Sequence, residues 1–218
     1  DVEFEFSNIE IANCEFRNGG TSADVNDCGG DGILIIDPPA LSYNINIHDN
    51  KFTNWGRWAF AIDLGGKGER IDGLKFNNNI CIQDDKNSNN AEKYRGLGWI
   101  DFESKKCFSN LEIKNNYVNG LNGFAINGAS EVTENVIILG NTIIRPDRNY
   151  KSAYPYMFNF YGVQIKDLIF EENDICKGTN RFGYTSNNIT IKNNKLRESI
   201  QIHGLYGDII VEKNSMEN

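Results

Sequence analysis

The stretch Asn188-Ile189-Thr190-Ile191-Lys192-Asn193-Asn194-Lys195-Leu196 is one copy of a nine-residue pattern that occurs eight times in this chain. Each copy reads polar, apolar, any, apolar, any, any, Asn, any, apolar. The other copies begin at Asn8, Asn44, Gly73, Asn110, Asn135, Asp167 and Asp208. The first copy has Cys14 in the Asn position, and the other seven keep the Asn, at Asn50, Asn79, Asn116, Asn141, Asn173, Asn194 and Asn214.

Apolar residues alternate at the second and fourth positions, which predicts a short strand with one buried face in each copy. The residues expected to point inward are Ile9/Ile11, Ile45/Ile47, Leu74/Phe76, Leu111/Ile113, Val136/Ile138, Leu168/Phe170, Ile189/Ile191 and Ile209/Val211. Because the ninth position is also apolar, we expect the chain to turn at the Asn and return to the same core. Asn suits such a corner, since it tolerates the left-handed backbone conformation that costs most residues about 1–2 kcal/mol.

A repeat that buries its apolar face only by stacking on its neighbours indicates a solenoid. Side-chain amides that recur at one position can also bond to one another along such a stack. The predicted fold is therefore all-β: a single-stranded right-handed parallel β-helix of about eight coils, with an Asn-ladder turn and loop insertions. An antiparallel β-sandwich also offers many short strands, but it gives no reason to repeat Asn at one register.

Length and termini bound the organisation of the chain. At 218 residues the sequence predicts one β-helix domain over 1–218. Residues 1–11 already alternate charged and apolar side chains, so no signal peptide is expected. No polar capping repeat closes either end. We expect the chain to be a fragment of a longer protein.

Composition excludes some classes of partner. The net charge of −8 and the pI of about 4.9 argue against nucleic acid and anionic membranes. No run of about 18 apolar residues is present, so no membrane insertion is expected. Five cysteines without metal-ligand spacing are interpreted as reduced thiols. With only His48 and His203 as histidines, a zinc site or a Ser/His/Asp triad has little support.

A second strand is expected after each corner, and aligning these strands gives an outward column of polar residues. We align Ile36, Ile62 and Ile100 as inward residues, so that the next residue of each points outward. The outward column then reads Asp37, Asp63, Asp101, Asn127, Asn159 and, in the last coil, His203.

Stacked parallel strands lie about 4.8 Å apart, which would place Asp63 and Asp101 on adjacent rungs, and Asp37 and Asp101 two rungs apart. Such separations suit the paired carboxylates of glycosidases. Crowded like charges favour the protonated form of one carboxyl, as a general acid requires. Glu103 completes the cluster. Alternatives stay open: these acids satisfy turn amides, or they bind calcium.

Aromatic and amide side chains near this column are the predicted substrate-binding residues. Flat rings stack on sugar faces, while amides and imidazoles bond sugar hydroxyls. The candidates are Trp58, Trp99, Asn127, Asn159, Tyr161 and His203. Trp58 has a simpler interpretation, in which it only covers a corner.

The outward position of the first strand changes character along the chain. It is Glu10, Asn46, Lys75 and Glu112 in the early copies, and Ile137, Ile169, Thr190 and Ile210 in the later ones. Branched apolar residues stacked on an exposed face indicate burial against something. We expect a homo-oligomer packed along this face.

The repeated Asn-Ile-x-Ile-x-x-Asn-x-Ile phrase, with segments such as Gly30-Asp31-Gly32-Ile33, resembles the pectin-lyase-like right-handed β-helix superfamily over nearly the whole chain. The motifs of particular enzymes in it are missing: Asn141-Thr142 is followed by Ile143, and Asp37-Pro38 by Pro39. What remains is most similar to a phage tailspike, a trimeric protein of the virion that cleaves bacterial surface polysaccharide. The resemblance implies an extracellular or virion location.

The resulting hypothesis is a glycoside hydrolase that acts on cell-surface polysaccharide. Asp63 and Asp101 would be the acid and base or nucleophile, with Asp37 or Glu103 as a third carboxylate. No cofactor is required, and calcium is the one metal left open. The alternatives are a non-catalytic carbohydrate-binding or structural shaft domain, and a polysaccharide lyase.

Overall fold

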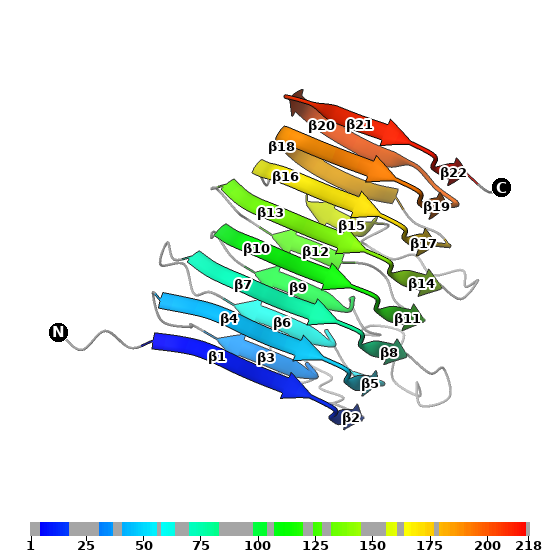
Figure 1. The fold of residues 1–218 in the computed structure, drawn as a ribbon. Coiled ribbons are helices and arrows are strands. Elements are labelled where there is room, and N and C mark those ends of the chain that lie inside the picture. The colour runs from blue at the N-terminus through cyan, green and yellow to red at the C-terminus, as the bar shows by residue number, and fades with distance from the viewer. Residues whose placement is uncertain are drawn as a thin grey trace.

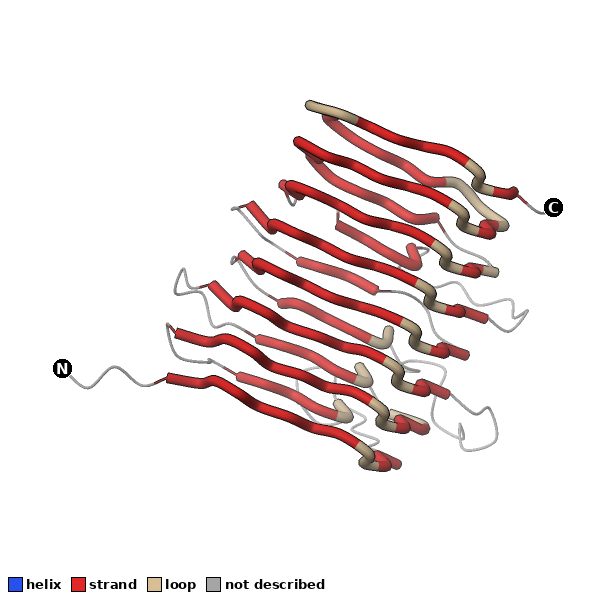
Figure 2. The backbone as a smooth tube through the Cα atoms, in the orientation of Figure 1, coloured by secondary structure: helices blue, strands red, loops and turns tan. Residues whose placement is uncertain are grey.

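The computed structural model describes residues 5–17, 31–36, 41–55, 58–63, 70–82, 98–103, 107–119, 124–127, 132–144, 156–160, 164–176 and 179–216. These residues form strands and short turns, and no helix occurs among them (Figures 1 and 2). Accordingly, none of them forms a helix long and apolar enough to cross a membrane. Every strand pair among the described residues is parallel, which argues against the antiparallel sandwich.

The strands form three stacks. The first stack carries the nine-residue pattern and consists of β1 (Glu5–Ala12), β4 (Leu41–His48), β7 (Arg70–Asn77), β10 (Cys107–Lys114), β13 (Val132–Leu139), β16 (Gln164–Glu171), the C-terminal part of β18 (Thr179–Lys192) and β21 (Ile209–Glu212). The second stack consists of short strands: β2 (Glu15–Arg17), β5 (Lys51–Thr53), β8 (Ile80–Ile82), β11 (Tyr117–Asn119), β14 (Thr142–Ile144), β17 (Asp174–Ile175), β19 (Lys195–Leu196) and β22 (Ser215–Met216).

The third stack consists of β3 (Ile33–Ile36), β6 (Phe60–Asp63), β9 (Ile100–Glu103), β12 (Phe124–Asn127), β15 (Tyr156–Phe160), the N-terminal part of β18 and β20 (Ile200–Tyr206). Because β18 runs through both, the first and third stacks belong to one 14-stranded sheet. The chain visits the first, second and third stacks in turn and then returns to the first. We number the eight copies of the pattern, each with its strands of the first and second stacks, as repeats 1 to 8.

The predicted inward residues form the core. In repeats 2 to 7 the second, fourth and ninth positions are at most 3% exposed, as for Ile45, Phe52 and Leu196. Repeat 8 lies at the edge of the stack, and its inward residues Val211 and Met216 are 58% and 70% exposed. Aromatic rings fill the space between the stacks, with Phe16 stacked on Phe52 at 4.9 Å between ring centroids.

The recurring Asn side chains form the expected ladder. Oδ1 of Asn116 accepts the backbone N–H of Asn79 at 2.9 Å and its Nδ2 at 3.3 Å. Nδ2 of Asn116 donates to Oδ1 of Asn141 and to the carbonyl of Phe76. The amide–amide bond recurs between each pair of neighbours from Asn50 to Asn214. The Asn side chains therefore tie the repeats together at one register.

The predicted reason for Asn at this position is wrong. The left-handed residue is the one before the ladder Asn, for example Asp49 (φ 55°), Asn115 (φ 54°) and Glu172 (φ 56°). The ladder position requires Asn for its hydrogen bonds rather than for its backbone conformation.

A second left-handed column explains the polar first position of the pattern. Asn8, Asn44, Asn110 and Asn135 have φ between 52° and 56° in the middle of first-stack strands, where the backbone bends. Their side chains bond between repeats, as from Asn44 Nδ2 to Asn8 Oδ1 at 2.8 Å. These contacts are exposed, so they stabilise the stack less than the buried ladder does.

We predict that Asn116→Ala lowers the free energy of unfolding by about 3 kcal/mol, because it leaves two donors of Asn79 without their acceptor in the core. The half-buried Asn119 serves as control, and Asn119→Ala should cost well under half as much. Urea unfolding followed by circular dichroism measures both. Equal costs for the two variants would contradict the role of the ladder.

Asn180 is a polar residue in the core, in register with the core residues Phe158 and Ile200. It is 0% exposed, and neither polar atom of its side chain has a hydrogen-bond partner among the described residues. We predict that Asn180→Leu raises the free energy of unfolding by about 1–3 kcal/mol, because an unsatisfied buried amide is removed. The same change at the ladder residue Asn173 should lower it. If both variants shift the urea midpoint in the same direction, the prediction is wrong.

Candidate functional site

The candidate site lies on the face of the third stack that points away from the core. Asp101 lies between the core residues Ile100 and Phe102, so strand alternation places it on this face. The backbone register aligns one residue per strand in a column that we call the outer column: Leu34, Ala61, Asp101, Ala125, Asn159, Arg181 and Gln201.

The register corrects the predicted carboxylate pair. Asp63 is aligned with Glu103, and Glu103 with Asn127. Asp101 is aligned with Ala61 and not with Asp63, so the prediction that Asp63 and Asp101 occupy matching positions is wrong. The reason is that Phe102, rather than Ile100, is the core residue aligned with Ile62. Asp37 lies outside the described residues, and for Asp63, Glu103 and Asn127 only the backbone is described.

Asn159 shows the same two-residue shift. It is aligned with Ala125 instead of Asn127, and His203 is aligned with Tyr184. A slip by two residues keeps every apolar side chain on the core face, so alternation alone does not detect it. Asp101 and Asn159 therefore lie on the outer face but not at the matching positions that were predicted. On β3 the shift is by one residue, because Ile35 and not Ile36 is aligned with Ile62, so the prediction that Ile36 points inward is wrong.

Burial divides the outer column into a covered part and an open part. Ala61 is 1% and Asp101 0% exposed, whereas Asn159 and Arg181 are half-buried, and Gln201 and His203 are exposed. The prediction that Asp101 faces solvent is therefore wrong. Asn159, Arg181 and Gln201 are therefore the polar residues of the outer column that are accessible to a ligand on this face.

The tryptophans predicted to stack on sugars are buried. Trp99 is 0% exposed, with its ring packed edge-to-face against Phe76 and Phe158 in the core, so it cannot contact a substrate at the surface. Trp58 lies on the expected face, packed against Ala61 and Leu34, but it is only 5% exposed. The simpler interpretation of Trp58, as a cover, fits this environment. Tyr161 lies outside the described residues.

Metal and thiol chemistry have few candidates. Among the described residues, no group of three His, Cys, Asp or Glu side chains could bind a metal ion. The described cysteines Cys14, Cys81 and Cys176 form no disulfide, in agreement with the prediction of reduced thiols. Burial raises the pKa of Cys81, which makes its thiol inert at neutral pH.

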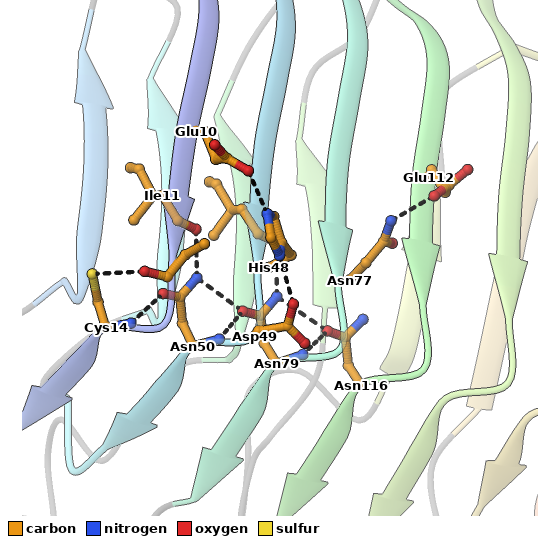
Figure 3. Close-up of polar contacts among 12 residues, drawn as sticks. Glu10, Ile11, Cys14, His48, Asp49, Asn50, Asn77, Asn79, Glu112 and Asn116 are labelled. Carbon is orange, nitrogen blue, oxygen red and sulfur yellow. Dashed lines mark hydrogen bonds and ion pairs between the residues drawn. The ribbon is translucent and has the colours of Figure 1, made fainter.

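The structure brings together a charged group that the pattern did not predict (Figure 3). His48, at the end of β4, contacts Asp49 through Nδ1 at 2.6 Å and Glu10 of β1 through Nε2 at 2.9 Å. Hydrogen bonds that its ring donates to Asp49 and then to Glu10 raise the pKa of His48. The sequence pattern could have predicted this contact. Glu10 and His48 occupy outward positions of neighbouring repeats, and in the strand register they are two residues apart.

A second charged group follows on the same face. Glu112 accepts from Lys114 at 2.6 Å and from Asn77. Although partial burial acts to raise it, the bonds from Lys114 and Asn77 keep the pKa of Glu112 below its usual value. Oδ1 of Asn77 also accepts the backbone N–H of Lys114 at 2.9 Å, so these residues bond to one another across β7 and β10 and support the sheet.

The chain matches no protein-family model, no curated protein and no solved structure.

Proposed function

We propose that the chain is a right-handed parallel β-helix and that its third stack acts on polysaccharide. The order in which the chain visits the three parallel stacks supports this architecture. Right-handedness is expected because nearly all crossovers between parallel strands are right-handed. The ladder from Asn50 to Asn214 fits a corner that recurs once per coil.

The observation that carries the functional proposal is the register of three carboxylates on β6 and β9. Asp63 and Glu103 occupy matching positions on neighbouring strands, and Asp101 lies one outward position from Glu103 on the same strand. Matching positions on stacked parallel strands are about 4.8 Å apart. That separation is close to the about 5–5.5 Å between the two carboxyl groups of retaining glycosidases.

The corrected register changes the proposed roles. Asp63 and Glu103 form the pair of general acid and nucleophile, in place of Asp63 and Asp101. Asp101 is fully buried, so it lies next to the pair without contacting the substrate. Like charges at matching positions on adjacent strands destabilise a sheet. Their presence here therefore favours a functional explanation for this cluster.

The open part of the outer column supplies groups suited to a sugar chain. Asn159 and Gln201 offer amide donors and acceptors, and Arg181 lies between them in register. His203 is exposed two residues beyond Gln201. A polysaccharide laid along the stack would cross these residues and reach β9 and β6 within the same face.

A second candidate function is non-catalytic binding or a structural shaft. It is favoured by the burial of Asp101 and Trp99, which removes two of the predicted site residues from solvent. A polysaccharide lyase is a third outcome, distinguished by an unsaturated product.

We predict that the chain releases reducing ends from one or more bacterial capsular or O-antigen polysaccharides. Asp63→Asn and Glu103→Gln should each lower kcat by at least about a hundredfold with binding retained, because each removes a group that takes part in proton transfer or attack. Asp174→Asn, on the second stack, is the matched control and should keep full activity.

Loss of activity in Asp101→Asn with unchanged activity in Glu103→Gln would contradict the corrected pair. Binding of a polysaccharide without cleavage would favour the second candidate function.

We further propose that the chain forms a homo-oligomer, as in a trimeric tailspike of a virion, through the apolar part of the first stack. Ile137, Ile169, Thr190 and Ile210 are aligned on its outward face. Ile169 and Ile210 are 38% and 46% exposed. Stacked apolar residues of this kind are typical of an interface.

We predict that the double variant Ile169→Lys with Ile210→Lys sediments as a monomer at concentrations where the parent chain is an oligomer, because two charges would be buried in the contact. Ile144→Lys is the control: Ile144 is 41% exposed on the second stack, and its variant should sediment like the parent. A monomeric parent chain would contradict the proposal.

A further inference from the structure

Repeat 1 (5–17) is attached to repeat 2 differently from every later pair of repeats. Cys14 stands in the ladder position, so its backbone N–H still donates to Oδ1 of Asn50 at 2.9 Å, but it has no amide to join the ladder. Its thiol donates to the carbonyl of Ala12 within the same repeat. The inward residues Ile9, Ile11 and Phe16 are only partly buried. Compared with repeats 2 to 7, repeat 1 therefore lacks one buried hydrogen bond and part of the core contact.

The group of Glu10, His48 and Asp49 bridges this junction. His48 belongs to repeat 2 and is aligned with Ala12 of β1, which brings its ring beside Glu10. Each ring nitrogen faces a carboxylate oxygen, Asp49 Oδ2 at 2.6 Å and Glu10 Oε1 at 2.9 Å. Ionised carboxylates only accept hydrogen bonds, so both contacts are favourable only when both ring nitrogens carry hydrogen. The geometry is that of an imidazolium ion between two anions.

The neighbouring strand β7 places an amide and a lysine near His48. On β7 the residue aligned with His48 is the uncharged Asn77, and Lys75 lies one outward position before it. Another ion pair between repeats 1 and 2 joins Lys51 to Glu15 at 3.4 Å, and the hydrogen bond from Arg17 lowers the pKa of Glu15, further from neutral pH. Histidine is the side chain whose ordinary pKa lies between pH 5 and pH 8, and His48 is the histidine at this junction.

We propose that Glu10, His48 and Asp49 form a pH-sensitive clamp, which fastens repeat 1 onto repeat 2 in acid and releases it as the pH rises. The clamp replaces the Asn–Asn side-chain hydrogen bond that joins the repeats at the other junctions.

The order of proton loss follows from the geometry. Asp49 makes the shorter contact and is the adjacent residue, so the neutral ring keeps its hydrogen on Nδ1. Nε2 then presents a lone pair to Glu10, and the contact that links the two repeats becomes repulsive. Asp49 and Glu10 raise the pKa of His48, so the clamp contributes its full stability below the unfolded-state pKa of about 6.5. That contribution is lost as the pH rises through the higher folded-state pKa.

Hydrogen exchange of the full chain tests the clamp. After correction for intrinsic exchange, the protection of β1 (Glu5–Ala12) relative to β10 (Cys107–Lys114) should fall several-fold between about pH 5.5 and about pH 8. His48→Gln keeps a donor but has no titrating charge, so the ratio should not change with pH. Glu10→Gln retains the His48–Asp49 pair and should also abolish the change. His203→Gln is the matched control and should behave like the parent.

A ratio in the parent chain that does not depend on pH would overturn the proposal. So would a pH dependence that survives in both His48→Gln and Glu10→Gln, because another group would then be responsible. The clamp does not depend on the polysaccharide-acting site, and either can fail without the other.

Discussion

The rest of the structure depends on one interaction, in which the side-chain oxygen of each ladder Asn accepts two hydrogen bonds. One oxygen, such as Oδ1 of Asn141, accepts both the backbone N–H and the side-chain amide of the preceding repeat. The donors and acceptors are buried, so a shift of one residue would leave several of them unsatisfied in an apolar environment. The ladder therefore sets the register of the first two stacks, and hydrophobic packing then acts on strands that are already aligned.

This constraint explains which parts of the structure could be predicted. In the first stack the sequence carries both an apolar alternation and an Asn at a constant offset, and the inward residues of repeats 2 to 7 agree with the prediction. The third stack has alternation but no ladder. No recurring residue marks its register, and residues of different size are aligned in it, such as Phe102 with Ile62. A shift by two residues preserves the pattern, and a sequence without structure does not reveal such a shift.

The sequence could predict which side of the third stack carries the candidate residues, but not how these residues are arranged there. Alternation correctly placed Asp101, Asn159 and Asp63 on strands whose opposite side is the core. It could not predict burial, because whether a residue on an outer face meets solvent depends on what packs over that face. Trp58 illustrates the point, since it lies on the outer face and is nevertheless buried against Ala61. Trp99 is the opposite case, in which an aromatic residue assigned to the surface fills the core.

The junction between repeats 1 and 2 shows how a stack tolerates the loss of one ladder amide. The backbone half of the ladder bond survives at Cys14 because it needs only the oxygen of Asn50. The missing side-chain half is replaced by an ionic contact on the solvent face, where His48 is close to Glu10 and Asp49. A buried amide bond does not depend on pH, whereas an exposed contact between an imidazolium and two carboxylates does. A single substitution within the ladder therefore replaces one pH-independent hydrogen bond between repeats with a contact that depends on pH, at a repeat whose inward residues are only partly buried.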